Sequence, residues 1–110
     1  MIAHICERSA WEQARAVGDY RPASLAAEGF IHASEPAQVL GVANRYYAGV
    51  QDLLLLWIDP QRLLPELRYE PSDGDLFPHI YGVLNLDAVI VVDSFLPDAD
   101  GIFRQLPAGV

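Results

Sequence analysis

The sequence predicts an α+β fold, with a mixed, mainly antiparallel sheet and two to three helices. Helical spacing of apolar residues occurs in the first half of the chain, whereas the second half is a succession of strand-like segments. No helical pattern separates the late strands, as parallel βαβ units would require. With 110 residues, of which 52% are hydrophobic, the chain can bury one core and is too short for two. We therefore expect a single domain over residues 1–110.

The first elements follow from local signals. Residues 2–6 (IAHIC) have the apolar character of a strand. Ser9 followed by Glu12 is a capping-box signature, because each side chain can satisfy a free backbone N–H of the other residue. The helix that they begin ends at Gly18, and residues 22–28 form a short helical turn.

A second strand and a second helix follow directly. Residues 29–33 (GFIHA) are predicted to be a strand, and Ser34 is placed to cap the next helix, in which Pro36 is tolerated in the first turn. An apolar stripe continues this helix to Val50. Residues 53–58 (LLLLWI) are apolar at every position, which is typical of a central strand.

The second half reads mainly as strands. Asp59-Pro60 ends the central strand, and a turn or short helix follows over 60–65. The remaining predictions are a strand over 67–70, a loop over 71–75, strands over 79–84 and 88–95, of which the second is buried, and a tail from Pro97 in which Ile102 and Phe103 pack back on the core.

Composition restricts the class of partner and the compartment. Fifteen acidic residues against seven arginines and no lysine give a net charge of −8, which makes nucleic acid an unlikely partner and favours a small ligand. No apolar run approaches the roughly 20 residues that cross a bilayer, so no membrane segment is expected. A lone Cys6 suits a reducing compartment, and no signal-peptide pattern follows Met1. We expect a cytoplasmic protein.

The three histidines occupy similar strand positions. They lie in IAHIC (2–6), GFIHAS (29–34) and FPHIYG (77–82). Because side chains alternate across a strand, each histidine shares a face with the residue two positions on: Cys6, Ser34 or Tyr81. An imidazole beside a hydroxyl is typical of general acid–base chemistry. The hypothesis is that His4, His32 and His79 line one site.

Candidate roles follow from these positions. His32 precedes the predicted helix start, where backbone N–H groups favour a phosphate. The predicted catalytic residues are His32, His79 and Tyr81, and the predicted ligand-binding residues are His4, Ser24, Ser34 and Glu70. Structural alternatives remain open for all of them: a strand histidine can bond to backbone, Ser24 and Ser34 can begin helices, and Glu70 can be a solvated edge carboxylate.

Other sites are less well supported by spacing. Three histidines can bind zinc, but intervals of 28 and 47 residues are unlike most zinc motifs, and no metal is predicted. Of the paired H-x-S/T motifs of some phosphodiesterases, only His32-Ala33-Ser34 is present. Asn44-Arg45 can be helix surface or a ligand clamp.

Taken together, these motifs resemble a known bacterial family. The segments that carry the resemblance are IAHIC, Ser24-Leu25, GFIHAS, Gln38, Val42-Ala43-Asn44, RYE (68–70) and FPHIYG. They are similar to the domain of unknown function 952 family over nearly the whole chain. That family has no established activity, and its fold is similar to that of the ADP-ribosyltransferases and the RNA 2′-phosphotransferases.

This resemblance implies roles for particular residues. His4 matches the first-strand histidine that holds the nicotinamide-side ribose in those enzymes, and His32 matches the key position of their second strand. Their ribose-binding glutamate is replaced here by His79, and Glu70 is off register. NAD is therefore implied as a possible substrate or ligand, and no other cofactor is indicated.

Two functions remain open at this stage. The first is a transferase or hydrolase that acts on NAD or another phosphorylated-ribose ligand. The second is a non-catalytic metabolite- or nucleotide-binding module that has lost the catalytic glutamate. The sequence does not indicate an oligomeric state.

Overall fold

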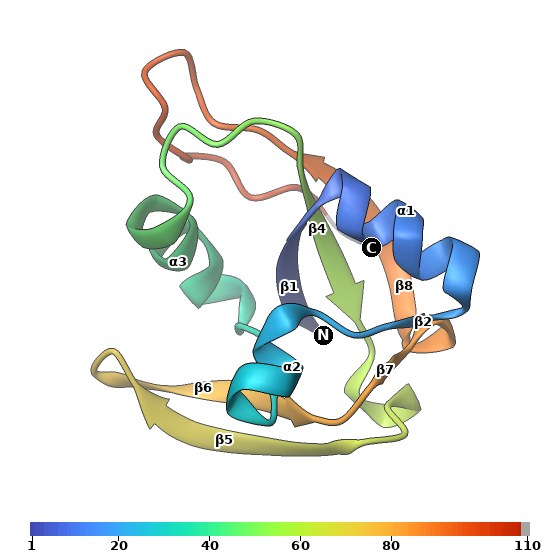
Figure 1. The fold of residues 1–110 in the computed structure, drawn as a ribbon. Helices are drawn as coiled ribbons and strands as arrows, with labels where there is room; N and C mark the ends of the chain where they lie inside the picture. Colours follow the sequence, from blue (N-terminus) through green and yellow to red (C-terminus); the bar gives the residue numbers. More distant parts are fainter. Residues whose placement is uncertain (109–110) are drawn as a thin grey trace.

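The structure, a computed structural model, describes residues 1–108 and is organised around a three-stranded antiparallel sheet (Figure 1). Its strands are β1 (Ile2–Glu7), β4 (Leu53–Ile58) and β8 (Val89–Phe95), in the order β1-β4-β8. All six side chains of β4 are buried, because β4 lies between two strands and is covered on both faces. The prediction of a central strand over 53–58 is confirmed.

Two smaller sheets complete the strand pairing. One has the order β3 (Ile31–His32), β6 (Asp75–Tyr81), β5 (Glu66–Ser72), and the other pairs β2 (Asp19–Tyr20) with β7 (Leu84–Asn85). All strand pairs of these sheets are antiparallel. The α+β class is confirmed, but the prediction of one mixed sheet is wrong, because the strands divide among three antiparallel sheets.

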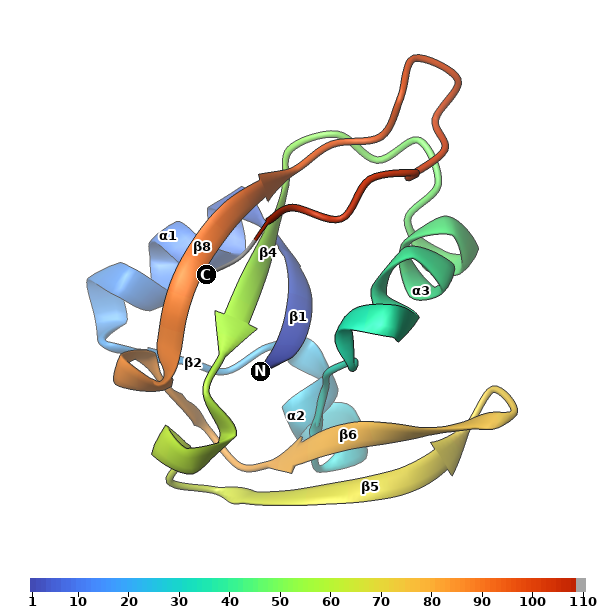
Figure 2. The ribbon, with the colours of Figure 1, turned by 180° about the vertical axis from the view of Figure 1, so that it is seen from behind.

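Helices cover both faces of the central sheet (Figures 1 and 2). They are α1 (Arg8–Val17), α2 (Ala23–Glu28) and α3 (Val39–Tyr46), with 3₁₀ turns η1 (Pro36–Gln38), η2 (Pro60–Arg62) and η3 (Leu86–Ala88). Trp11 of α1 packs with Leu54 and Leu56 on one face of β4. Val39 of α3 packs with Leu53 and Leu55 on the other. Alternation along one strand thus divides the buried residues into two clusters.

Helix α1 begins earlier than its capping signature indicates. Strand β1 runs directly into α1, whose N-cap is Glu7 with no side-chain cap hydrogen bond. The Arg8 N–H instead donates to the Asp52 carbonyl at 3.1 Å, so the Ser9–Glu12 capping box is wrong. The predicted end at Gly18 is confirmed, because this glycine adopts φ 107° and its N–H donates to the Ala14 carbonyl.

The helix expected directly after His32 also begins later. Its first turn is η1, its N-cap is Glu35, and the Glu35 N–H donates to Oε1 of Gln38 at 2.9 Å. Ser34 does not cap it, because its backbone pairs with Ala3 through two hydrogen bonds of 2.8 Å. This bridge joins the central sheet to the β3-β6-β5 sheet.

The segment 71–75 is a tight hairpin turn rather than a longer loop. Asp73 and Gly74 have φ values of 51° and 82°, as in a type I′ turn, so β5 continues to Ser72 and β6 begins at Asp75. The strand predicted over 88–95 is present as β8, but the prediction that it is buried is wrong for one of its faces. Strand β8 is at the edge of the sheet, and one of its faces, including Val92, is exposed.

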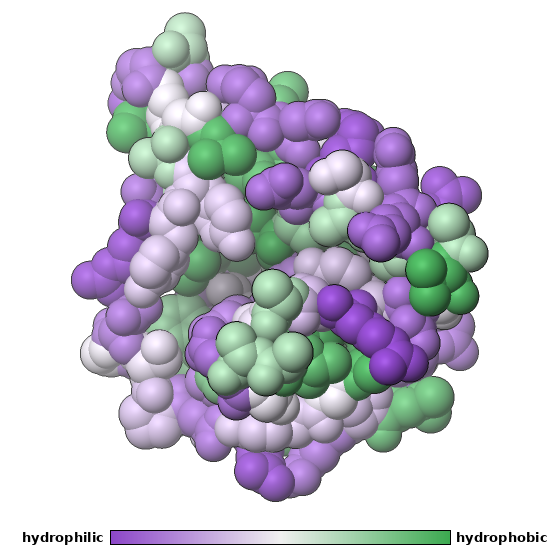
Figure 3. All heavy atoms as spheres, in the orientation of Figure 1, coloured by the Kyte–Doolittle hydropathy of each residue, from purple (hydrophilic) through white to green (hydrophobic). Residues whose placement is uncertain are grey.

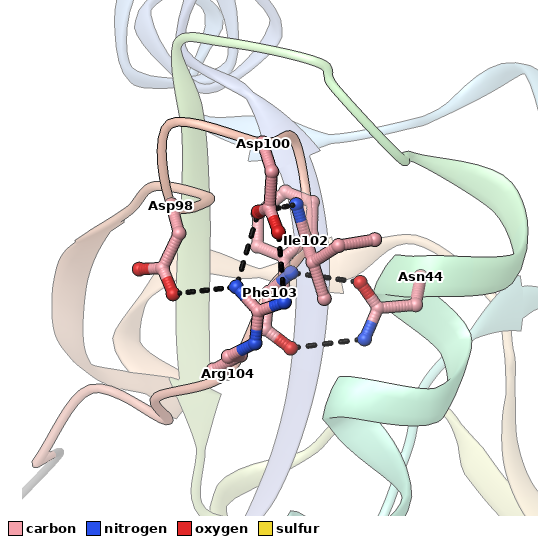
Figure 4. A network of polar contacts seen from close by, with 6 residues as sticks. All are labelled: Asn44, Asp98, Asp100, Ile102, Phe103 and Arg104. Carbon is pink, nitrogen blue, oxygen red and sulfur yellow. Dashed lines mark hydrogen bonds and ion pairs between the residues drawn. The ribbon is translucent and has the colours of Figure 1, made fainter.

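The C-terminal tail is held against α3 (Figure 4). The Asn44 amide donates to the Phe103 carbonyl at 2.9 Å and accepts from the Phe103 N–H at 2.7 Å. Arg104 binds Asp98 and Asp100 in the same turn. Phe103 is buried against Phe95, which confirms that it packs on the core, whereas Ile102 is 36% exposed. Asn44 therefore binds the tail rather than facing a ligand.

No helix in the described part of the chain has the length and apolar character needed to cross a membrane.

Candidate functional site

A cleft of about 800 Å³ lies where β1, α2, β3, α3 and the β5–β6 hairpin approach one another. The space-filling view shows a hollow on this side of the molecule, between the regions of α3 and α2 (Figure 3). His4, His32 and His79 all belong to its wall. The structure therefore brings the three predicted histidines to one cleft, although their surroundings differ greatly.

His79 is the most constrained of the three. It lies on β6, directly opposite His32 of β3, and is only 5% exposed. Its Nδ1 atom is 2.8 Å from Oε1 of Glu70, which also accepts the hydroxyl of Tyr81. The ring of Phe30 stacks on the imidazole, with 4.0 Å between ring centroids. Both the position and the plane of the His79 ring are thus fixed.

These contacts also determine which nitrogen of His79 carries a proton. Hydrogen bonds from Tyr81 and His79 lower the pKa of Glu70, so this carboxyl group is ionised near neutral pH and can only accept. Nδ1 of His79 is therefore the donor. In the neutral ring, Nε2 has a free lone pair. Nε2 is buried and has no hydrogen-bond partner within residues 1–108.

His32 is the exposed member of the set. Its side chain is 52% exposed, and its Nε2 atom is 3.1 Å from Oε1 of Glu28, the last residue of α2. The His32 ring meets the edge of the His79 ring with 5.6 Å between centroids. Two imidazoles, each with a carboxylate partner, therefore stand side by side at the cleft.

His4 instead connects secondary-structure elements. Its Nδ1 atom donates to the carbonyl of His32, and its Nε2 atom accepts the hydroxyl of Tyr20 at 2.8 Å. Burial lowers the pKa of His4 to about 4, so the ring is neutral at pH 7. Because both ring nitrogens are occupied, His4 braces β1 against β3. Its predicted contact with a ligand stays a prediction.

The other predicted residues divide into two groups. Ser24 on α2 and Ser34 after β3 belong to the cleft wall, and Ser34 is buried. Glu70 and Tyr81 do not line the cleft. Glu70 hydrogen bonds to His79 in the cleft wall, and Tyr81 hydrogen bonds to Glu70. Cys6 also lines it, but burial raises the pKa of this thiol to about 12, so it stays protonated.

Sequence reasoning missed two partners. Tyr20 and Glu28 hydrogen bond to His4 and His32 across loops whose geometry the sequence does not specify. Strand alternation does place Phe30 on the His32 face, where the two rings meet, but it does not predict that Phe30 stacks on His79.

The donor set does not suit a bound metal ion. Within the described residues, no group of three or more histidine, cysteine, aspartate or glutamate side chains is arranged to hold one. The cleft instead presents the half-exposed imidazole of His32 and hydroxyl groups at Ser24 and Ser34, and the unpaired acceptor Nε2 of His79 is buried in its wall.

The fold and this cleft define a class of small α+β proteins with no assigned activity. The chain belongs to the family described as "Protein of unknown function (DUF952)", which matches residues 5–92.

Solved structures of one relative share this architecture. The crystal structure of protein CC0527 from Caulobacter crescentus has 33% sequence identity and a TM-score of 0.85, and the match covers 94% of this chain and 92% of that one. The solution NMR structure of the same protein has 33% identity and a TM-score of 0.81, with 94% and 90% covered. No curated protein matches the chain.

Proposed function

We propose that this protein is an enzyme, a transferase or hydrolase that acts on NAD or another phosphorylated-ribose ligand bound in the histidine-lined cleft. The observation that carries the proposal is the state of His79. Its ring is oriented by an ionised carboxylate, and its other nitrogen is a buried acceptor without a partner. A buried polar atom left unpaired costs about 1–3 kcal/mol, which a ligand donor at this position would recover.

The chemistry assigns a role to each ring. A hydroxyl group of water or of an acceptor attacks the ribose or phosphorus centre and loses its proton to Nε2 of His79. Glu70 stabilises the imidazolium that forms, as the carboxylate of a catalytic triad does. At phosphorus, the P–O bond to the leaving group breaks and His32 can return a proton to the leaving oxygen; at the ribose of NAD, the C1′–N bond breaks and neutral nicotinamide leaves without needing a proton. Tyr81 holds Glu70, and His4 holds the backbone of His32. These last two are positioning residues.

The test is a panel of ligands with matched variants. NAD, ADP-ribose, ribose 5-phosphate and nucleoside monophosphates are each titrated by calorimetry and then incubated, with products separated by chromatography. We expect one of them to bind and to be converted by the wild-type protein, and His79→Gln to abolish conversion while binding is retained. Arg62→Gln, a surface change outside the cleft, should behave as wild type. Absence of binding across the panel overturns the proposal.

One observation favours the second candidate, a non-catalytic binding module. Nε2 of His79 is buried, and the ring of Phe30 stacks on the same imidazole, so a ligand does not reach Nε2 in this arrangement of side chains. A ligand that binds tightly and is recovered unchanged after prolonged incubation supports the module. Conversion that depends on His79 excludes it.

A further inference from the structure

The charged side chains in the cleft wall are mainly acidic. Among residues 1–108, three carboxylates line it, Glu7 from β1, Glu28 from α2 and Asp73 from the hairpin turn, and no arginine does. The sequence contains no lysine. Of the three histidines, His4 is neutral at pH 7 because burial lowers its pKa to about 4. A polyanionic ligand would therefore enter a negative potential without a fixed cation to receive it.

The three carboxylates differ in whether a basic side chain lies close enough to balance their charge. Glu28 has His32 at 3.1 Å, and Asp73 has Arg45 at 3.5 Å. The Glu7 side chain has no ion pair or hydrogen bond among the residues that the structure describes. Its charge acts on the cleft interior: burial is the main cause that raises the pKa of Tyr47, and the negative charge of Glu7 contributes to the same shift.

Aromatic rings accompany these carboxylates. Tyr20, the adjacent Tyr46 and Tyr47, and Phe77 come from three separate parts of the chain, and all line the cleft. The faces of aromatic rings attract organic cations, and the attraction grows when the cation is desolvated. Carboxylates beside tyrosine rings form the usual environment for an alkylated ammonium or a cationic heteroaromatic ring.

The helix start near His32 does not compensate for the missing cations. Its N-cap is Glu35, which is itself negative, and Pro36 has no N–H to offer to an anion. The negative charge of Glu35, whose carboxylate accepts the Tyr69 hydroxyl, therefore disfavours a phosphate at the position that the sequence predicts.

A separate observation indicates that the cleft is built for a ligand. His79 is 5% exposed, lies in the wall, and has a ring nitrogen without a partner within the described residues. We infer that the cleft encloses a positively charged organic nitrogen of its ligand, such as an N-alkylated pyridinium or a quaternary ammonium, and leaves any phosphate outside. This inference rests on the proposed function in that it concerns the ligand of the same cleft.

Two matched ligand pairs test the charge preference separately from the nucleotide proposal. The first pair is choline and 3,3-dimethylbutan-1-ol, which have almost the same shape and differ by the positive charge. The second pair is NAD in its oxidised form, with a cationic ring, and NADH, with a neutral ring and the same phosphates. Affinities are measured by calorimetry at low and at physiological salt.

We expect the cationic member of each pair to bind at least about tenfold more tightly, a difference that corresponds to one cation–π or ion-pair contact in a partly desolvated site. The variant Glu7→Gln should reduce this preference about threefold or more. Glu12→Gln, which removes an exposed carboxylate outside the cleft, should leave it unchanged.

The possible outcomes separate the two proposals. Equal affinity for NAD and NADH, with detectable binding, overturns the charge preference and leaves the nucleotide proposal standing. Binding of choline without binding of NAD, NADH or any ligand of the nucleotide panel supports the charge preference and overturns the nucleotide proposal. No binding of any probe overturns both. Thermal unfolding of Glu7→Gln must match that of Glu12→Gln within a few degrees, so that lost affinity reflects charge rather than damage to α1.

Discussion

Nδ1 of His79 lies 2.8 Å from Oε1 of Glu70, across the antiparallel pair formed by β5 and β6. Because hydrogen bonds from Tyr81 and His79 keep Glu70 ionised, this contact selects the tautomer of the histidine. It therefore determines which ring nitrogen faces any chemistry in the cleft.

The tautomer is the first testable consequence. Long-range ¹⁵N–¹H NMR at pH 8 should show His79 of the wild-type protein with its proton on Nδ1. In Glu70→Gln the neutral amide accepts less strongly, so the ring should populate both tautomers. Glu66→Gln removes an exposed carboxylate from the same strand and should leave the wild-type pattern. A proton found on Nε2 in the wild type contradicts the assigned geometry.

Phe30 controls access to His79. Its ring stacks on the imidazole, and Nε2 beneath it is buried, whereas the side chain of His32 is half exposed. Diethyl pyrocarbonate should therefore modify His32 rapidly and His4 and His79 slowly. In Phe30→Ala we expect the rate at His79 to rise about tenfold or more, followed by mass spectrometry of peptides.

His4 supplies the internal control for that measurement. It is buried by other elements, so its rate should not change in Phe30→Ala. Rapid modification of His79 in the wild type would show that Phe30 does not cover it.

The buried His4 should make stability depend on pH. Its pKa is near 6.5 in the unfolded chain and falls to about 4 in the folded protein because of burial. Between these values the unfolded state binds more protons, so the free energy of unfolding decreases as the pH falls from 6.5 to 4. Above pH 6.5, His4 does not reduce the free energy of unfolding. By about pH 4, its titration has reduced the free energy of unfolding by up to about 3 kcal/mol.

Urea unfolding between pH 7.5 and pH 4 measures this effect. His4→Gln removes the titrating group and retains polar atoms, so its free energy of unfolding should fall less steeply over this range than that of the wild type. Carboxylates titrate in both proteins and cancel in the difference. Parallel curves for the two proteins would mean that His4 titrates normally.

The local parts of the fold were predictable because their causes are local. LLLLWI is apolar at every position and is buried at every position, and Gly18 ends α1 through its own positive φ. Alternation likewise placed Phe30 and His32 on one face, where their rings meet.

The partners of the histidines depend on register, which alternation alone does not give. Glu70 and His79 meet only because the type I′ turn at Asp73-Gly74 fixes the pairing of β5 with β6. Asp-Gly is a strong hairpin signal, and reading it as one would have predicted that contact. The Glu28–His32 contact depends on how α2 enters β3, and burial of His4 depends on the packing of three segments. No short stretch of sequence specifies the Glu28–His32 contact or the burial of His4.

The hydrogen bonds between Asn44 and Phe103 should stabilise the tail. Asn44→Ala removes both, and the buried Phe103 N–H and carbonyl lose their partners. We expect a loss of about 2 kcal/mol in the free energy of unfolding, and faster hydrogen exchange at the Phe103 amide. Gln105→Ala, at an exposed position of the same tail, should change neither. Unchanged exchange in Asn44→Ala would mean that packing of Phe103 alone holds the tail.

Substitution of two glycines by alanine should change the free energy of unfolding in opposite directions. Gly82 has φ 156°, and a Cβ there would lie 2.7 Å from Cβ of Pro65, so the backbone or the proline must shift. Gly82→Ala should therefore destabilise the protein by about 2 kcal/mol. Gly41 lies in α3, is exposed and has no atom within 4 Å of a built Cβ, so Gly41→Ala should stabilise by up to about 1 kcal/mol. Urea unfolding of both variants measures these changes in the free energy of unfolding. No change in Gly82→Ala would mean that the turn before β7 shifts at little cost to remove the close contact with Pro65.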